Sequence, residues 1–287
     1  MAYKYILNLS CPDRTGIVCA VSGFLSKLEI NILSSAQYFD RESGKFFMRV
    51  EVSSELHKQE LPEIEAKWTE IAQKWRMQSQ WFDAEKKARV LIMVSKEGHC
   101  LNDLLFQAAE GRLPIEVVAV AGNHEILKPY ADFYQIPFYY WALNGKNDAN
   151  KVQQEGKLIS AVEELNIDTV VLARYMQILS PQLCAFLEGR AINIHHSFLP
   201  SFKGAKPYYQ AHARGVKLIG ATAHYVSTDL DEGPIIEQDV ARVRHDKTVE
   251  ELTSIGNDIE RIVLSRALRW HAEHRVIING NKTVVFN

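Results

Sequence analysis

The sequence predicts two α/β domains in series, and a change of pattern along the chain supports this division. Residues 1–84 alternate short strand-like and helical segments. The chain from residue 85 to 287 contains continuous apolar runs, which are typical of parallel strands covered on both faces. A charged run, Asp83 to Lys87, separates the two patterns. The 287 residues, 47% of them hydrophobic, are enough for two cores.

The first domain has six predicted elements in the order strand, helix, strand, strand, helix, strand. The helices show apolar residues spaced three and four apart, and one strand alternates apolar and polar residues. The strands are expected at 3–9, 30–39, 46–52 and 77–82, and the helices at 15–27 and 60–75. This order predicts a ferredoxin-like domain over residues 1–84.

The second domain is predicted to hold a doubly wound, Rossmann-like parallel sheet, because its apolar runs alternate with helical segments. The apolar runs are 89–94, 115–121, 168–172 and 191–194, and the helical segments are 101–110, 124–134 and 151–165. Two further strand-like runs, 218–226 and 234–240, precede a long helix from 248 to about 273 and a short tail.

Charge and composition exclude several classes of protein. Lys and Arg number 33 and Asp and Glu 35, so the net charge of −2 lacks the basic excess of a general nucleic-acid binder. No stretch approaches 18 apolar residues, and the N-terminus turns polar before a signal segment forms. We therefore expect a cytoplasmic protein with a small-molecule substrate and neither a nucleic-acid nor a membrane partner. The four cysteines form no CxxC and predict free thiols.

Polar residues gather where two strands of the second domain end, which is where ligands bind in open α/β sheets. Asn193 and His195 stand two apart at the end of one strand and so share a face. The run 218–226 leads into an acidic turn with Asp229 and Asp231. A carboxamide and an imidazole can stabilise an oxyanion, while a carboxylate orients the imidazole or a water. Because the Gly-x-Ser-x-Gly elbow is absent, we expect direct transfer of an acyl group to water or an amine.

The same residues allow less specific interpretations. Asn and Asp at strand ends often only make turns. Residues of metal-ligand type are also present, namely His195, His196, His212, His224 and Asp231. None of them stands in an H-E-x-x-H motif, so we predict no metal and no cofactor. We expect His271 and His274, on the last helix, to be solvated surface residues.

Three blocks of the second domain strongly resemble the folate-dependent formyltransferases. They run from Val170 to Pro181, from Asn193 to Gly204 and from His224 to Ile236. The resemblance implies that Asn193 and His195 stabilise the oxyanion and that Asp231 acts as the acid/base or water-ordering group. It also implies a folate pocket, with Arg174, Tyr175, Met176, Ile178, Leu179, His196, Asp229 and Gly233 as substrate-binding residues.

Three features indicate water as the formyl acceptor. The stretch from Ser95 to Asn102 lacks the Gly-Ser-Asn phosphate loop of the family's glycinamide ribonucleotide enzymes and carries Glu97. His196 stands where those transferases usually carry Pro, and an N-terminal domain is added. Over the whole chain, the resemblance is to the deformylase branch of the family. It implies hydrolysis of 10-formyltetrahydrofolate to tetrahydrofolate and formate, which supplies formate and balances one-carbon folate pools for purine biosynthesis.

The first domain is similar to ACT domains, on the segments Leu9 to Val18 and Ile30 to Ile32. The resemblance implies an amino-acid effector, glycine or methionine, at Asp13, Gly16 and Asn31, and a homo-oligomer formed through these domains. The loop ending at Gly16 would offer N–H groups at a helix N-terminus to a carboxylate. The alternative is that this loop is only a turn and cap, in a domain that serves dimerisation.

Two other functions stay open on the sequence. One is a formyltransferase acting on glycinamide ribonucleotide, an aminoacyl-tRNA or an amino sugar. The altered phosphate loop opposes the first acceptor, and the lack of an extra basic C-terminal domain opposes the tRNA. The other is a sensor of folate or amino acids without turnover, which the intact Asn193, His195 and Asp231 oppose.

Overall fold

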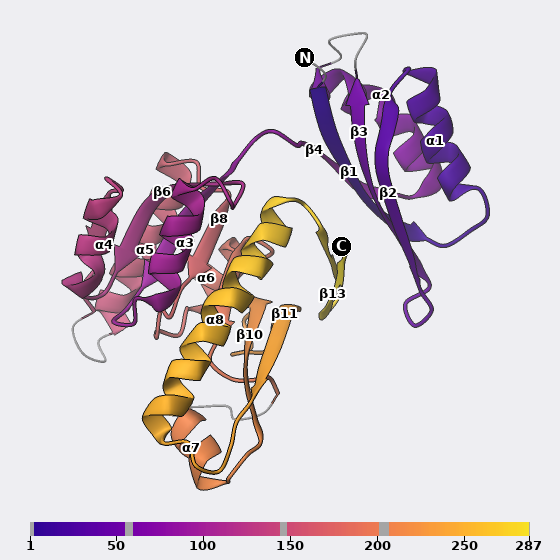
Figure 1. Ribbon diagram of the computed structural model, residues 1–287. Helices are drawn as coiled ribbons and strands as arrows, with labels where there is room; N and C mark the ends of the chain where they lie inside the picture. Colours follow the sequence, from indigo (N-terminus) through magenta and orange to yellow (C-terminus); the bar gives the residue numbers. More distant parts are fainter. Residues whose placement is uncertain (1–2, 55–59, 144–147, 201–206, 287) are drawn as a thin grey trace. The chain divides into compact units, whose positions relative to one another are not determined.

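The computed structural model describes residues 3–54, 60–143, 148–200 and 207–286 (Figure 1). The chain divides into two compact units. Unit 1 combines the chain as far as Lys87 with Glu273–Asn279 and a last segment from Val284, and unit 2 contains Ala88–Ala272 and Gly280–Thr283. The predicted boundary at 84/85 thus lies three residues before the division at 87/88. However, residues 273–279, expected in the second domain, pack with the first.

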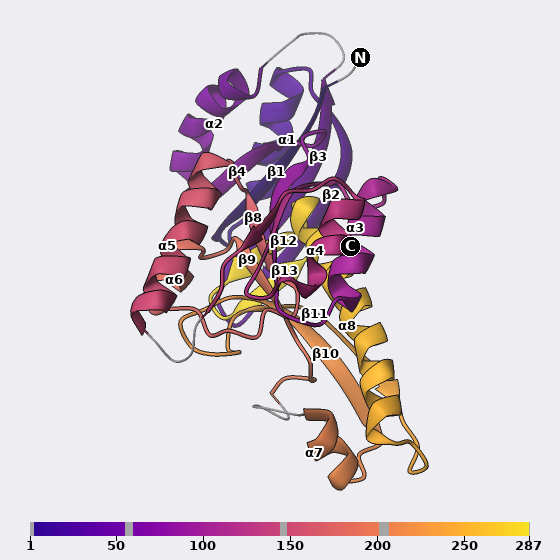
Figure 2. The same cartoon turned by 90° about the vertical axis from the view of Figure 1, so that its left-hand side faces the viewer.

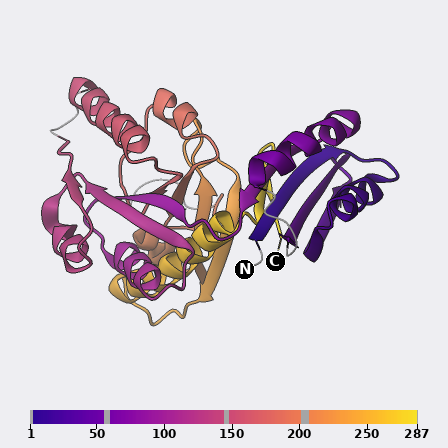
Figure 3. The same cartoon turned by 90° about the horizontal axis from the view of Figure 1, so that it is seen from above.

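Unit 1 is an antiparallel sheet with two helices on one face (Figures 1 and 3). The strand order is β2-β3-β1-β4, which confirms the ferredoxin-like prediction. The elements are β1 (Tyr3–Pro12), α1 (Ile17–Lys27), β2 (Asn31–Asp40), β3 (Lys45–Ser54), α2 (Leu61–Trp75) and β4 (Gln78–Asp83). The core forms between the sheet and the helices, where Phe24 of α1 meets Trp68 of α2 edge to face at 5.0 Å.

Unit 2 is built on a seven-stranded sheet of order β11-β10-β9-β8-β5-β6-β7. The strands are β5 (Ala88–Val94), β6 (Ile115–Gly122), β7 (Phe138–Tyr140), β8 (Thr169–Leu172), β9 (Ala191–His195), β10 (Leu218–Tyr225) and β11 (Ile235–Arg242). β5 to β9 are parallel, and β10 runs antiparallel to both of its neighbours. The order reverses between β5 and β8, so the switch point of the sheet lies there. The doubly wound prediction is confirmed, and β7 is an additional short strand.

Helices cover both faces of this sheet (Figure 3). They are α3 (His99–Ala109), α4 (Lys128–Phe133), α5 (Asp148–Glu164), α6 (Pro181–Phe186), α7 (Pro207–Ala213) and α8 (Val249–Ala272), with a 3-10 turn η1 (Glu125–Leu127) before α4. α8 lies along β10 and β9 and also contacts α3 and α7 (Figure 2). α5 and α6 contribute Leu158, Val162 and Leu183 to a core with β5 and β8. Within the described ranges, no helix is both long enough and apolar enough to cross a membrane.

The end of the chain is a hairpin of β12 (Val276–Asn279) and β13 (Lys282–Val285). The segment before it packs in unit 1. Arg49 donates from Nε to the carbonyl oxygen of His274 at 3.1 Å and from Nη2 to that of Glu273 at 3.0 Å. The His274 ring stacks on Phe82 at 3.6 Å. The prediction of a solvated His274 on the helix is therefore wrong, because the helix ends before this residue.

His271 is also not a solvated surface residue. Its Nε2 lies 2.9 Å from the hydroxyl of Thr169 and its Nδ1 lies 2.8 Å from the hydroxyl of Tyr225. Burial lowers the pKa of His271 to about 4. Leu264 and Leu268, seven and three residues earlier on α8, are fully buried, so the apolar face of the helix continues to this position.

Candidate active site

The residues predicted to be catalytic meet at the end of β9. Asn193 and His195 project from β9, His224 from the neighbouring β10, and Asp231 from the turn that follows β10. In the antiparallel register His224 stands directly opposite Asn193. Opposite residues have neighbouring side chains, so this register accounts for the contact between the two.

His224 fixes the orientation of the Asn193 carboxamide. Burial lowers the pKa of His224 and keeps its ring neutral. Its Nδ1 lies 2.9 Å from the carbonyl oxygen of Tyr225, so the ring proton belongs on Nδ1. Nε2 then accepts a hydrogen bond from Asn193 Nδ2 at 3.2 Å. The second Nδ2 hydrogen of Asn193 is left to donate elsewhere.

One ring nitrogen of His195 faces a carboxylate, and the other has no hydrogen-bond partner among the described residues. Its Nδ1 lies 3.3 Å from Oδ1 of Asp231, and the side chains are only 6% and 15% exposed. Its Nε2 is buried and makes no hydrogen bond with any described residue. Because buried polar atoms are normally satisfied, an imidazole nitrogen in this state is a candidate for contact with a ligand.

Asp231 is an ionised carboxylate at this site. Burial alone would raise the pKa of Asp231, but the hydrogen bond and the electrostatic interaction with His195 lower it overall. Its backbone is left-handed, with φ 58°. Asp229, two residues earlier, is exposed, which agrees with the choice of Asp231 over Asp229.

Gly233 holds the turn that carries Asp231. A Cβ at this position would lie 1.7 Å from the carbonyl oxygen of Tyr225, which no side chain could tolerate. The adjacent Pro234 accepts a hydrogen bond from the backbone N–H of Tyr225. The structure therefore gives Gly233 a packing role, whereas the sequence analysis assigned it to substrate binding.

A cavity of about 470 Å³ lies beside the loop after β8. Four predicted substrate-binding residues line it, namely Tyr175, Met176, Ile178 and Leu179. The remaining lining residues are Met93, Trp141, Leu143, Lys151, Gln154, Glu155, Leu158, Gln177 and Leu183. The mainly apolar wall with a few polar groups is typical of a site for a flat organic ligand. Burial raises the pKa of Tyr175 to about 12, so its hydroxyl stays protonated.

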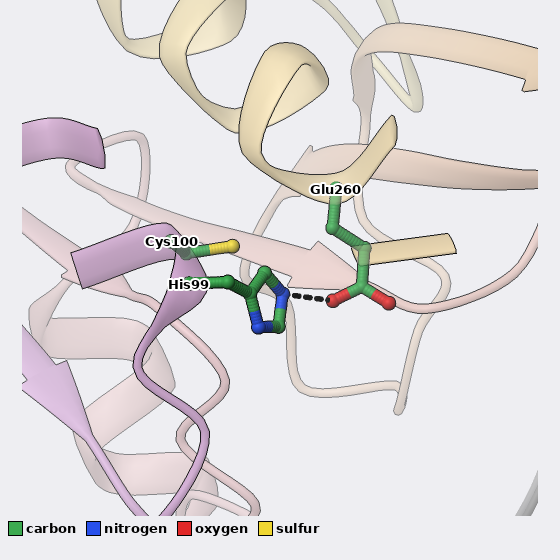
Figure 4. A group of neighbouring side chains, drawn as sticks. All are labelled: His99, Cys100 and Glu260. Atoms are coloured by element: carbon green, nitrogen blue, oxygen red, sulfur yellow. Dashed lines mark hydrogen bonds and ion pairs between the residues drawn. The ribbon is translucent and has the colours of Figure 1, made fainter. Parts of the chain in front are cut away.

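Arg174 points into a second group of side chains, which we call the Glu260 cluster and define as His99, Arg174, Tyr208 and Glu260 (Figure 4 shows two of them, with Cys100). The Glu260 carboxylate lies 2.8 Å from His99 Nε2 and accepts from the Tyr208 hydroxyl at 2.6 Å. Arg174 Nε stands 3.4 Å from the same carboxylate. Arg174 has a left-handed backbone, φ 62°, so it departs from the cavity-lining residues that follow it.

Glu260 is fully buried and nevertheless charged. Burial would raise the pKa of Glu260, but the hydrogen bond from His99, the charge of Arg174 and the hydroxyl of Tyr208 outweigh it and lower the pKa. Removal of one partner from such a buried charge typically costs about 3–5 kcal/mol. Sequence reasoning missed Glu260 and Tyr208, although a spacing of four residues places Gly256 and Glu260 on one face of α8.

His196 lies between the catalytic candidates and the Glu260 cluster. Its ring stacks against that of His195 at 5.1 Å and lies 6.5 Å from that of Tyr208. Burial is the main cause that lowers the pKa of His196 to about 4, and the charge of Arg174 is the second cause. The ring is therefore neutral at physiological pH. The structure places His196 beside the catalytic candidates rather than on the wall of the cavity.

The described residues that bring metal-type ligand atoms together are not the ones considered from the sequence. Over the described parts of the chain, the group with three metal-type ligand atoms within 4.8 Å of one another is His99, Cys100 and Glu260. The guanidinium of Arg174 next to Glu260 opposes a divalent cation there. Burial raises the pKa of the Cys100 thiol well above its usual value, which keeps it protonated.

The predicted effector residues lie at opposite ends of the unit 1 sheet, because the end of β1 pairs with Lys45 of β3 whereas Asn31 pairs with Ser53, near the other end of that strand. Asp13 and Gly16 belong to the loop between β1 and α1, and Asn31 begins β2. All three are exposed, and no hydrogen bond or ion pair among the described residues links them. Gly16 has φ 97°, and a Cβ there would meet the Trp75 ring at 3.1 Å, so a tight turn accounts for this glycine. The last residues of the second sequence block, 201–204, lie outside the described residues.

Comparison with known proteins identifies both units. The ACT domain family model matches residues 5–69, and the formyl transferase model matches residues 88–268. A formyltetrahydrofolate deformylase from Corynebacterium sp. (strain P-1) is 46% identical over 98% of both chains. The crystal structure of one from Pseudomonas syringae pv. tomato has a TM-score of 0.96 at 44% identity, over 100% of this chain and 95% of that one.

A more distant structure matches a smaller part of the chain. Glycinamide ribonucleotide transformylase 1 from Symbiobacterium toebii has a TM-score of 0.65 at 28% identity and covers 70% of this chain and 95% of its own. The deformylases match over the whole length, both units included. The chain therefore belongs to the family of the formyltetrahydrofolate deformylases, with an ACT domain followed by a formyl transferase domain.

Proposed function

We propose that this protein hydrolyses 10-formyltetrahydrofolate to tetrahydrofolate and formate. The observation that carries the proposal is the state of His195, whose Nδ1 faces Asp231 at 3.3 Å while its Nε2 is buried without a partner. Asn193, oriented by His224, supplies a carboxamide from the same face of β9. The membership of the deformylase family supports the same reaction.

In the proposed mechanism, His195 acts as general base and then as general acid. Nε2 takes a proton from the water that attacks the formyl carbon, and Asp231 stabilises the imidazolium that forms. Asn193 donates to the oxyanion of the tetrahedral intermediate, a contribution of about 3 kcal/mol. The imidazolium returns the proton to N10 as the C–N bond breaks. N10 leaves with the bonding electron pair, and the carbon retains both oxygens as formic acid, which ionises to formate.

We place the folate in the cavity beside the loop after β8. Its flat pterin would lie against the apolar wall, with Met176 and Ile178 at the rim, where both side chains are more than half exposed. Gln154 lines this cavity with a buried Oε1 that has no partner among the described residues. An N–H group of the pterin would satisfy that oxygen. Metabolically, the reaction would release formate and balance the folate pools used in purine synthesis.

Unit 1 would regulate this activity by binding an amino acid, glycine or methionine, at the loop that contains Asp13 and Gly16, whereas Asn31 lies at the other end of the sheet. The exposed loop at the N-terminus of α1 supports a carboxylate ligand, since the N–H groups of that turn are free of a capping side chain. We also propose a homo-oligomer formed through this unit. The exposed apolar side chains of β2 support it, and among them are Ile32, Leu33, Tyr38 and Phe39.

The test is the release of formate and tetrahydrofolate from 10-formyltetrahydrofolate in buffer without an amine. We expect equimolar products from the wild type. Asp231→Asn should lower kcat by about 10²- to 10⁴-fold, because the imidazolium loses its counter-charge. Asp246→Asn is the matched control, since this exposed carboxylate lies in another turn of unit 2, and its rate should stay near that of the wild type. Equal rates for Asp231→Asn and the wild type would refute the mechanism, and no formate from the wild type would refute the function.

A further inference from the structure

The surroundings of His195 raise the question of which nucleophile can reach the formyl carbon. Unit 2 matches a formyl transferase model, and a transformylase structure covers 70% of this chain, so the scaffold as such is compatible with a larger acceptor. A restriction to water must then come from local side chains. The candidates are the groups packed around the ring of His195.

Two of the directions around His195 are occupied. Nδ1 faces Asp231, and one ring face stacks on His196 at 5.1 Å. His196 in turn meets Tyr208 of the Glu260 cluster, with 6.5 Å between ring centroids. The electrostatic interactions of His196 include those with Arg174 and Glu260 of the cluster as well as those with His195 and Asp231. The cluster therefore begins one ring away from the proposed base.

The Glu260 cluster is largely buried. The Glu260 side chain is 0% exposed, that of Arg174 13% and that of His99 16%. Tyr208 and His196 are also buried. A carboxylate that is held by His99 of α3, Tyr208 of α7 and Arg174 after β8 ties three elements to α8. Such a group cannot shift aside without breaking several charged contacts at once.

Gly256 shows how closely Tyr208 is seated. A Cβ on this α8 residue would lie 2.0 Å from the Tyr208 hydroxyl and 2.2 Å from its Cζ. The ring thus lies on bare helix backbone and reaches Glu260 one turn further on. A glycine inside a helix is unfavourable, so its presence here indicates that the position of the ring matters.

We infer that the Glu260 cluster determines acceptor specificity, because its packed polar side chains fill the space an amine would need and leave room only for water. The inference rests on the proposed hydrolysis. It assigns the cluster no bond making or breaking: water remains the nucleophile, and His195 carries the proton. When the cluster is opened, a primary amine should take the formyl group from N10 and form an N-formyl amine in place of formate.

The experiment follows both products when 10-formyltetrahydrofolate is supplied with glycinamide, a small uncharged primary amine. The wild type should release formate and no N-formylglycinamide, at any glycinamide concentration. Tyr208→Ala and His99→Ala should raise the ratio of N-formylglycinamide to formate by about tenfold or more, as expected when a pocket that rejects a competitor is enlarged. Tyr208→Phe keeps the ring, and His245→Ala removes an exposed histidine from a loop of unit 2, so both should release formate alone.

Each outcome separates this inference from the proposed function. Formate release by the wild type without glycinamide tests the hydrolysis by itself. N-formylglycinamide from the wild type would overturn the inference. This measurement uses no variant, so it remains informative if Tyr208→Ala does not fold. His99 lies at the edge of the cluster, and a folded His99→Ala that still yields only formate at saturating glycinamide would overturn the inference as well.

Discussion

At the scale of single residues, the protonation of His224 decides what its neighbour Asn193 can do. His224 is neutral with its proton toward the Tyr225 carbonyl, and so it can only accept from Asn193. A protonated ring would instead donate and would turn the carboxamide oxygen toward His224. The Nδ2 hydrogens of Asn193 would then lie where its oxygen now lies and could not donate to an oxyanion at the present position of Nδ2. Burial of His224 therefore sets the polarity of the site.

Asn193→Ala should lower kcat by about 10²- to 10³-fold, the usual loss when one oxyanion donor is removed. KM should change little, because the donor acts on charge that develops only in the transition state. Steady-state formate release, with a thermal melt to check the fold, measures both quantities. A change in KM alone would assign Asn193 to substrate binding instead.

Gly233→Ala should abolish most of the activity and destabilise unit 2. Its Cβ would overlap the Tyr225 carbonyl oxygen, so the turn that carries Asp231 must open. Gly215→Ala is a useful control, because nothing lies within 4 Å of its Cβ, although its φ of 60° carries some strain. Formate release and melting temperature distinguish the two variants, and a Gly233→Ala protein with wild-type values would contradict this role.

The sequence could indicate Asn193, His195 and Asp231 because they stand in short blocks on consecutive strands. Glu260 was not foreseen, since its partners come from α3, from α7 and from the residue after β8. Only the packed fold brings such distant positions together. Arg174 was expected to bind the substrate, and its left-handed backbone, which the sequence does not reveal, turns it to Glu260.

At the scale of elements, the long periodic segments were predicted well, whereas several of the short ones were missed. The long helix was expected from 248 to about 273 and is observed as Val249–Ala272. The strand β7 has three residues and the helices α6 and α7 have six and seven, which is too little for a periodic signal. The tail of the chain was likewise not expected to form a hairpin, because its two strands have four residues each.

The end of α8 makes the stability of unit 2 depend on pH. The pKa of His271 falls from 6.5 to about 4 on folding, so its contribution is present above about 6.5 and is lost as the pH falls toward 4. Between pH 7.5 and 5 this amounts to about 2 kcal/mol. Urea unfolding at the two pH values should show a smaller loss for His271→Gln than for the wild type. His245→Gln, on an exposed loop, should keep the wild-type loss, and identical losses in all three proteins would contradict the assignment.

At the scale of the whole molecule, unit 1 offers an edge for association. β2 lies at the edge of its sheet and is exposed along nearly its entire length, apolar side chains included. Such edges normally carry charge or are covered. The exposed side chains of β2 therefore favour a second copy of this chain as the cover.

Leu33→Glu should convert the expected dimer to a monomer in sedimentation experiments, because it puts a charge on β2 where the side chain is 46% exposed. Phe133→Glu is the control, since this apolar residue of unit 2 is 79% exposed and lies outside unit 1. It should leave the dimer intact. A monomeric wild type, or a dimer that survives Leu33→Glu, would exclude this edge.

The segment Glu273–Asn279 belongs to unit 1 although it follows the whole of the second core in the chain. During synthesis, the partners of Arg49 and Phe82 therefore emerge only after residues Ala88–Ala272 of unit 2 have been made. Unit 1 therefore cannot complete its fold from the chain as far as Lys87 alone. Transplanting this unit onto another protein would require two pieces of chain, and a fragment cut at residue 84 would lack the backbone carbonyls that the buried Arg49 needs.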